Sequence, residues 1–245
     1  MRPLESDLRQ GLADLALVLN DVQINRLLDY LELIQKWTQV YNLTSVRKPS
    51  EMLTHHLLDS LAVIAPLRAK LGSPPAESAG QSSASPTNGS RPRLLDVGSG
   101  AGLPGVVIAI CCPDVQVDCV DTVAKKAAFI RQVAATLRLP NLQGLHARVE
   151  SLTKHYDVIS SRAFASLVDF TNWSSAALAE QGVWMAMKGK HPIEEMAALP
   201  TGVEVFHVEH LTIPGLDAER CILWLRKALF STVTEGAVNP REEAV

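Results

Sequence analysis

The chain has 245 residues, of which 47% are hydrophobic and 20% are charged. This composition excludes a wholly disordered chain, and the length suits one large globular domain with or without a small appendage. The longest apolar run, residues 102–112, is about half of the roughly 20 residues that a membrane-spanning helix needs, so we expect no membrane association. The N-terminus lacks the basic start and apolar stretch of a signal peptide, and the four cysteines show no C-x-x-C spacing. These features predict a cytoplasmic protein whose cysteines are reduced.

The net charge of −3 hides an uneven distribution of charged side chains. Residues 1–71 carry eight basic and eight acidic side chains, residues 91–165 carry nine and six, and residues 166–245 carry six and eleven. Contact with a polyanion is therefore expected only from a local patch in the first two-thirds of the chain.

Residues 1–71 predict a helical N-terminal cap. An amphipathic segment covers residues 8–19. After Asp21, which we expect to be an N-cap, apolar residues recur at spacings of three and four as far as Tyr41, which places one continuous stripe on a helix. A further helix is expected to begin at Pro49 and to run through Ile64.

Residues 72–93 have a different composition from the rest of the chain. Thirteen of these 22 residues are Gly, Pro or Ser, and none is aromatic or a large aliphatic. Such a segment has too little apolar surface to offset the entropy of ordering, so we expect a flexible linker. Residues 231–245 are polar and are expected to form a disordered tail.

From residue 93 onward, strand-like and helix-like runs alternate. Strands are expected at 93–97, 116–120, 142–147, 157–160 and 183–187, with helices at 104–112, 124–137 and 167–178. This rhythm predicts right-handed crossovers and a parallel sheet with both faces covered. Two further strands, 203–210 and 220–226, have no helix between them and predict an antiparallel hairpin at the sheet edge. The fold class is therefore α/β, a Rossmann-like seven-stranded sheet in a second domain spanning residues 94–230.

The segment 94–105, LLDVGSGAGLPG, predicts a ligand site. An apolar strand runs into a glycine-rich turn and then into a helix that begins near Pro104. Glycines let the chain turn sharply and let a ligand approach the backbone. The turn is expected outside the carboxyl end of the first strand, where open α/β sheets bind ligands.

Two cofactors fit this turn. Residues 100–105 match the dinucleotide pattern G-x-G-x-x-G, with Asp121 placed to hold a ribose. The same segment matches the S-adenosylmethionine pattern of an acidic residue followed by G-x-G-x-G. We favour the second reading because Asp96 precedes the glycines, where it would repel a pyrophosphate, and because Gly98 directly follows the strand. A purely structural turn is the third reading. The matching residues are Asp96, Gly98, Gly100 and Gly102.

Other candidate ligand contacts fall at the ends of later strands. Asp121, followed by Thr122, ends the second strand, and its carboxylate can accept from both ribose hydroxyls or cap the next helix. Glu150, in the pair with Val149 after the third strand, is a candidate for the adenine amino group or an ordinary loop carboxylate. Arg162, after the fourth strand, falls on the same edge and is a candidate to brace the cofactor or hold a phosphate.

The residues after the fourth strand disfavour two kinds of methyl transfer. Residues 160–164 read SSRAF, which lacks the Asn/Asp-Pro-Pro-aromatic element common in base-amino methyltransferases. None of the four cysteines lies where carbon-5 pyrimidine methylation needs its nucleophile. A target atom that needs neither a nucleophile nor a base would fit this sequence. Guanine N7 is such an atom, because it is a bare lone pair with no proton to remove, and its methylation needs only proximity and orientation. We therefore assign no catalytic acid or base.

The order of several motifs resembles that of the bacterial 16S ribosomal RNA guanine-N7 methyltransferases, once called glucose-inhibited division protein B. The likeness covers roughly residues 22–71 and 93–227. The motifs are Asn42-Leu43-Thr44, His55-His56 with Asp59-Ser60-Leu61, the segment 96–105, Asp121-Thr122 with Lys125-Lys126, Arg148-Val149-Glu150, Ser161-Arg162-Ala163 and Lys188-Gly189. The resemblance implies a class I S-adenosylmethionine-dependent methyltransferase domain that methylates one guanine in the 530 loop of 16S rRNA.

The residue patterns and the family resemblance together predict which residues contact the cofactor and the RNA. The cofactor S-adenosyl-L-methionine is expected to touch Asp96, Gly98, Gly100, Gly102, Leu103, Asp121, Thr122, Val149, Glu150 and Arg162. The partner implied is 16S rRNA in the small ribosomal subunit, with no DNA, and the candidate RNA contacts are Lys125, Lys126, Arg131, Lys188 and Lys190. Two alternatives stay open: an NAD(P)-dependent oxidoreductase, and a non-catalytic ribosome-assembly factor that binds S-adenosylmethionine.

His55 and Asp59 lie four residues apart on one predicted helix, which is a spacing found in metal sites. No third ligand is evident, so we expect no metal and favour a polar contact. The resemblance would place this pair at the junction between the cap and the sheet.

Overall fold

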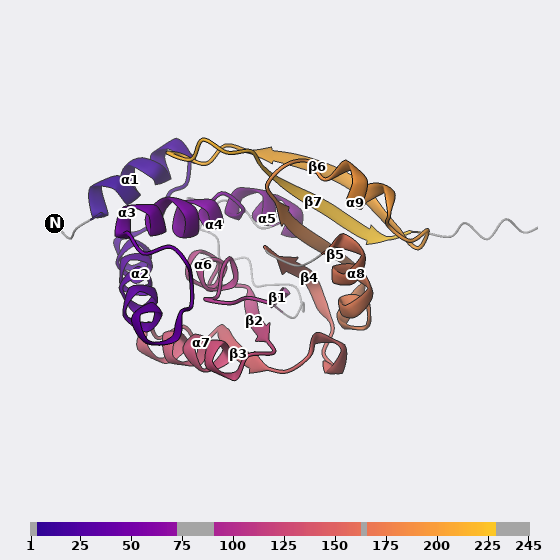
Figure 1. Ribbon diagram of the computed structural model, residues 1–245, viewed down its shortest axis with the longest axis horizontal. Helices are drawn as coiled ribbons and strands as arrows, with labels where there is room; N and C mark the ends of the chain where they lie inside the picture. Colours follow the sequence, from indigo (N-terminus) through magenta and orange to yellow (C-terminus); the bar gives the residue numbers. More distant parts are fainter. Residues whose placement is uncertain (1–3, 73–90, 163–165, 229–245) are drawn as a thin grey trace, which may run out of the picture.

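The computed structural model describes residues 4–72, 91–162 and 166–228, and its centre is a seven-stranded sheet (Figure 1). The strand order is β3-β2-β1-β4-β5-β7-β6. The first five strands run parallel, whereas β7 pairs antiparallel with both β5 and β6. The predicted α/β class and edge hairpin are confirmed. The bounds are β1 Arg93–Val97, β2 Gln116–Asp121, β3 Leu142–His146, β4 Tyr156–Ser161, β5 Leu178–Lys188, β6 Val203–Leu211 and β7 Arg220–Lys227.

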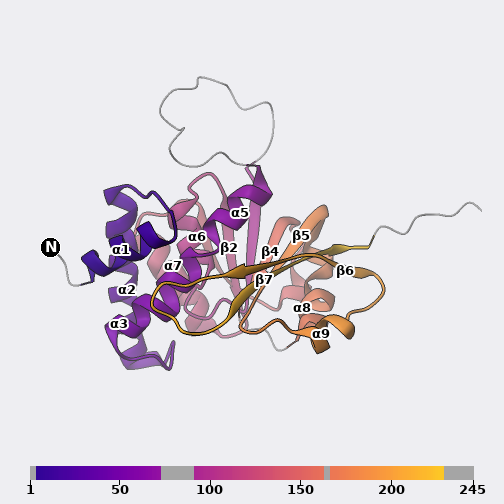
Figure 2. The same cartoon turned by 90° about the horizontal axis from the view of Figure 1, so that it is seen from above.

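Helices cover both faces of this sheet. Figure 1 and Figure 2 show the N-terminal helices with α6 and α7 on one side, and α8 and α9 on the other. The α-helices are α1 Glu5–Asp14, α2 Asp21–Tyr41, α3 Pro49–Met52, α4 Asp59–Leu61, α5 Ile64–Leu71, α6 Gly105–Cys111, α7 Ala124–Thr136, α8 Leu167–Ser174 and α9 Ile193–Ala197. Short 3-10 turns are η3 Val149–Ser151 and η4 Ser175–Ala177, and η1 Leu53–Leu58 is a π-helix.

The two faces of the sheet belong to two separate hydrophobic clusters. Because side chains alternate along a strand, Leu94 of β1 packs toward the N-terminal helices, whereas Leu95 packs toward α8. The first cluster joins α2, α6 and α7 through fully buried residues such as Leu27, Val106 and Ile130. The cap helices and the sheet therefore share one core, which holds the cap firmly against the sheet. The domain boundaries at 71 and 94 stay predictions.

Three helix predictions need correction. The N-cap of α2 is Asn20 and not Asp21: its side chain accepts from the Gln23 N–H at 2.9 Å, and Gln23 accepts from the Asn20 N–H at 3.1 Å. This capping box fixes the helix start one residue earlier than expected. Helix α1 ends at Asp14 and not at residue 19, because Ala16 has a φ of +52°. The helix predicted from Pro49 contains a π-helical turn and continues to Leu71 as α5.

Strand β5 begins at Leu178, five residues before the predicted start. The helix predicted over 167–178 is correspondingly shorter, because α8 ends at Ser174 and a 3-10 turn precedes the strand. Helix α9 between β5 and β6 was not predicted. Most of the predicted linker and the whole predicted tail lie outside the described residues. Within the described ranges, no helix has both the length and the apolar character needed to cross a membrane.

Candidate functional site

The glycine turn after β1 has the backbone conformation that the sequence predicts. Gly98, Gly100 and Gly102 have φ values of +65°, +58° and +91°, a region that favours glycine. A Cβ at Gly102 would lie 2.5 Å from Ile130 Cδ1, so this position needs glycine for space as well. The neighbouring Leu103 is buried. The first glycine of the turn is therefore exposed, whereas Gly102 and Leu103 at its end are tightly packed.

Asp96 supports the turn from behind. Its carboxylate is fully buried, with Oδ2 accepting from the Gly105 N–H at 2.9 Å and Oδ1 accepting from the Ser160 hydroxyl at 3.1 Å. Burial raises the pKa of Asp96 to about 7, against the lowering effect of these two hydrogen bonds. Asp96 thus joins the end of β1 to the start of α6 and to β4.

Helix α2 holds the turn from the side of the cap. The hydroxyl of Tyr30, a fully buried residue, donates to the carbonyl oxygen of Ala101 at 2.6 Å. This bond links residues 71 positions apart and fixes one carbonyl of the turn. The cap is therefore part of the frame that shapes the glycine turn.

Asp121 joins the end of β2 to the same turn. Its Oδ2 accepts from the Gly100 N–H at 3.1 Å, and its Oδ1 accepts from the Val123 N–H at 2.8 Å. Lys126 lies 3.5 Å from Oδ2. Two carboxylate oxygens offer about four acceptor positions, so two backbone bonds leave capacity for a ligand hydroxyl. Helix α7 has Val123 as its N-cap and no side-chain cap hydrogen bond, so the helix-cap interpretation of Asp121 is wrong, and the ribose interpretation stays a prediction.

A cavity opens at the carboxyl ends of the strands beside this turn. We call it the glycine-turn cavity; it is lined by Val97, Gly98, Val120, Asp121, Thr122, Ala147, Arg148, Val149, Glu150 and Trp173. Five of the ten predicted cofactor residues line it, namely Gly98, Asp121, Thr122, Val149 and Glu150. Trp173, on α8 and 43% exposed, was not among the predicted residues because its helix is remote in sequence from the turn. Helix α8 is amphipathic, and one tryptophan on it gave no signal of a ligand.

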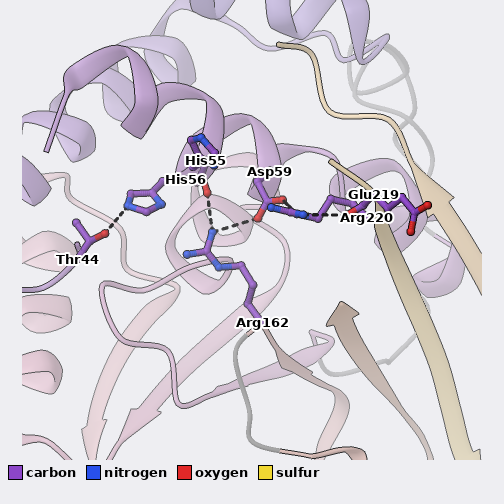
Figure 3. Close-up of polar contacts among 7 residues, drawn as sticks. All are labelled: Thr44, His55, His56, Asp59, Arg162, Glu219 and Arg220. Atoms are coloured by element: carbon purple, nitrogen blue, oxygen red, sulfur yellow. Dashed lines mark hydrogen bonds and ion pairs between the residues drawn. The ribbon is translucent and has the colours of Figure 1, made fainter. Parts of the chain in front are cut away.

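Arg162 lies in a different hollow, farther along the same sheet edge. Its Nη1 donates to the His55 carbonyl at 3.0 Å and to Asp59 Oδ2 at 3.2 Å. Arg220, at the start of β7, donates from Nε to Asp59 Oδ1 at 2.8 Å. Figure 3 shows the two guanidinium groups approaching Asp59 from different sides. Asp59 is therefore the junction between the cap, β4 and β7, as the resemblance implied, and it is 3% exposed.

The predicted RNA contacts differ in how far their charges are already engaged. Lys188 pairs with Glu195 at 2.7 Å, and Arg131 donates to the Gly144 carbonyl at 3.1 Å. Lys125 lies over the ring of Tyr41, 5.3 Å from its centroid. Lys126 faces Asp121, as described above, and Lys190 is exposed. Four of the five side chains therefore already contact a protein group.

His56 is a buried titratable group next to this junction. Its Nε2 lies 2.8 Å from Thr44 Oγ1, whereas its Nδ1 is buried without a hydrogen-bond partner among the described residues. Burial, followed by the positive charge of Arg162, lowers the pKa of His56 to about 4. His56 is therefore neutral at physiological pH.

The sheet order, the antiparallel β7 and the glycine-turn cavity define a class I S-adenosylmethionine-dependent methyltransferase. The E81Q mutant of MtNAS, a solved structure, shares the fold with a TM-score of 0.51 and 14% identity, over 84% of this chain and 75% of that chain. The family model for GidB, rRNA small subunit methyltransferase G, matches residues 23–71 and 80–223. The chain belongs to this family.

Curated relatives carry the same family name. Ribosomal RNA small subunit methyltransferase G of Albidiferax ferrireducens is 72% identical over 229 residues, which cover 93% of this chain and 99% of that protein. The protein of the same name from Polaromonas sp. strain JS666 is 66% identical, over 92% of this chain and 95% of its own length.

Proposed function

We propose that this protein transfers the methyl group of S-adenosyl-L-methionine to N7 of one guanine in the 530 loop of 16S rRNA, acting in the cytoplasm on the small ribosomal subunit. Membership of the rRNA small subunit methyltransferase G family supports a ribosomal RNA substrate. The observation that carries the cofactor assignment is the contact between Asp121 and Gly100, which joins two strand ends beside one cavity.

The residues around the glycine-turn cavity suit the adenosyl half of the donor. Asp121 would accept from the ribose hydroxyls, since its carboxylate has acceptor capacity beyond its two backbone bonds. Val149 and Glu150 would face the adenine, and Trp173 would pack against the ring. Gly98 is exposed and offers its backbone to the ligand.

Asp96, Gly102 and Leu103 have a supporting role in this proposal. All three are buried, and Asp96 is already bonded to protein groups on both carboxylate oxygens. Their effect on the donor would be indirect, through the shape of the turn. Arg162 does not line the glycine-turn cavity and is bonded to His55 and Asp59, so its effect on the donor would also be indirect.

The chemistry asks little of acid or base groups. S-adenosylmethionine supplies an electrophilic methyl on a sulfonium, and the lone pair of guanine N7 forms the new C–N bond as the S–CH₃ bond breaks. The sulfur leaves as a neutral thioether and the positive charge moves to the guanine, so no proton is transferred. The protein then accelerates the reaction by holding the two reactants in line and excluding water.

Calorimetry on three variants tests the cofactor assignment. Asp121→Ala and Gly98→Val are expected to abolish binding of S-adenosylmethionine without unfolding the protein. Asp114→Ala is the matched control, because this exposed carboxylate precedes the other end of β2. Wild-type affinity in folded Asp121→Ala or Gly98→Val protein would refute the assignment.

Transfer of a labelled methyl group tests the reaction itself. The purified protein is expected to label 30S subunits from cells that lack it, and mass spectrometry is expected to map the label to one 530-loop guanine. A protein that binds the donor but leaves the RNA unlabelled would be an assembly factor. A protein that binds NADH in preference to S-adenosylmethionine would be an oxidoreductase.

A further inference from the structure

A second hollow opens at the carboxyl edge of the sheet, beyond the glycine-turn cavity. We call it the arginine hollow; it has a volume of about 350 Å³ and is lined by His55, Asp59, Arg162, Met187, Lys188, Gly189 and Arg220. Because β7 is antiparallel, its first residue lies at the same edge as the last residue of β5, and Lys188 pairs with Cys221 in the ladder. The hollow therefore faces the same side of the molecule as the glycine-turn cavity.

The position of the hollow suits the acceptor and not the adenosyl group. The glycine-turn cavity lies over β1, β2 and the turn after β3, whereas the arginine hollow lies over β4, β5 and β7. Strand β7 is three places from β1 in the sheet, which is about 14 Å at the usual spacing between strands. A nucleotide lying along this edge can present its base near the donor and its backbone to the hollow.

The guanidinium of Arg220 is held by two hydrogen bonds and has further N–H groups available for a ligand. Its Nε donates to Asp59 and its Nη1 donates to the Glu219 carbonyl at 2.8 Å. A guanidinium has five N–H groups, so these two bonds leave three without an acceptor among the described residues. A Cβ at Gly189 would still lie 3.9 Å from Arg220 Nη1, so the glycine leaves space beside the guanidinium.

The charges around the hollow leave an excess of one positive charge. Arg162 and Arg220 share the single carboxylate of Asp59, which neutralises one of them. The charge of Lys188 is matched by Glu195. In Figure 3 the carboxylate of Glu219 points away from this network, and Glu219 is exposed. A net charge of +1 with several free donors matches one phosphodiester group.

We propose that the arginine hollow binds a backbone phosphate of the acceptor RNA next to the target guanine, with Arg220 as its main donor. This inference rests on the proposed function, since it assumes an RNA acceptor. Asp59 holds the guanidinium through Nε, so Arg220 loses little side-chain freedom when the phosphate binds. A bidentate contact to guanine O6 and N7 is the alternative use of an arginine, but it would occupy the atom that receives the methyl group.

Steady-state methylation of 30S subunits by Arg220→Gln tests this proposal. Loss of a charge-assisted hydrogen bond is expected to raise KM for 30S subunits about 10-fold to 100-fold. The slope of log KM against log salt is expected to fall by about 1, because one fewer phosphate is neutralised. The Kd for S-adenosylmethionine is expected to stay within about twofold of wild type, since Arg220 lies outside the glycine-turn cavity.

Two variants serve as controls. Arg226→Gln removes the same charge from the same strand, but at the end away from the hollow, where Arg226 pairs with Glu204. It is expected to leave KM near the wild-type value. Arg220→Lys keeps the charge and its pairing with Asp59, so it is expected to fold like wild type and to keep the salt slope, while KM stays raised because the planar donor edge is lost.

The outcomes separate this inference from the proposed function. If wild-type protein labels 30S subunits and Arg220→Gln has the KM and salt slope of Arg226→Gln, the phosphate site is wrong and the proposed function stands. If Arg220→Gln weakens S-adenosylmethionine binding as much as it weakens 30S binding, the hollow holds the donor and the inference is overturned. If wild-type protein transfers no methyl group to 30S subunits, the proposed function fails first.

Discussion

Acidification is expected to destabilise this protein through His56. The side chain is 5% exposed, and within the described ranges only its Nε2 has a hydrogen-bonding neighbour, Thr44 Oγ1 at 2.8 Å. Protonation would place a positive charge at a buried position that already faces Arg162, which is why the pKa falls to about 4 from an ordinary 6.5. The neutral folded state is favoured above pH 6.5, and this contribution is lost progressively as the pH falls from 6.5 to 4.

The size of the effect follows from the two pKa values. Each pKa unit corresponds to about 1.4 kcal/mol, so the shift of His56 limits the loss to about 3 kcal/mol. Between pH 7.5 and pH 5.0 the loss from His56 is about 2 kcal/mol, because protonation of the unfolded chain is nearly complete at pH 5.0 while the folded protein remains mostly neutral. That loss is a substantial part of the free energy of unfolding of a typical domain, which is about 5–15 kcal/mol.

Urea unfolding at pH 7.5 and pH 5.0, at one ionic strength, measures this loss against a variant. His56→Gln cannot be protonated and can still bond to Thr44, so wild type is expected to lose about 2 kcal/mol more than the variant. The comparison also removes the contribution of Asp96, whose raised pKa favours the folded state as the pH falls from 7 toward 4. His55→Gln, at an exposed neighbour, is the control. Parallel pH dependence in wild type and His56→Gln would refute the reasoning.

Three further substitutions test the frame of the glycine turn. Gly102→Ala is expected to lower the free energy of unfolding by about 2–5 kcal/mol, since the new Cβ meets Ile130 and φ is +91°. Gly72→Ala, where φ is +67° and no atom lies within 4 Å of the new Cβ, is expected to lower it by about 1 kcal/mol in the same urea titration. Tyr30→Phe leaves the Ala101 carbonyl without its donor and is expected to cost about 1–2 kcal/mol, with weaker S-adenosylmethionine binding by calorimetry. Trp173→Ala is expected to weaken that binding about 10-fold with little change in unfolding free energy; an unchanged Kd would remove Trp173 from the site.

Much of the sheet could be predicted from the sequence because its signals are local. Strand β1 has the predicted bounds, and β2, β3, β6 and β7 differ by one residue at one end. The glycines at 98, 100 and 102 form the sharp turn that their pattern suggested, and the structure gives them positive φ values. The boundaries that failed, such as the end of α1 at Asp14, depend on turn geometry, which residue periodicity does not encode.

The sequence by itself determined the alternation of strands and helices, the glycine turn and the carboxylate that ends β2, since each depends on neighbouring residues. Only the tertiary structure decided what those groups contact. Asp59 meets Arg162 and Arg220 across separations of 103 and 161 residues, and Trp173 meets the glycine-turn cavity from α8. Such contacts arise when the cap and the closing hairpin pack onto the sheet, and their pairing is set by shape and charge in three dimensions and not by spacing along the chain.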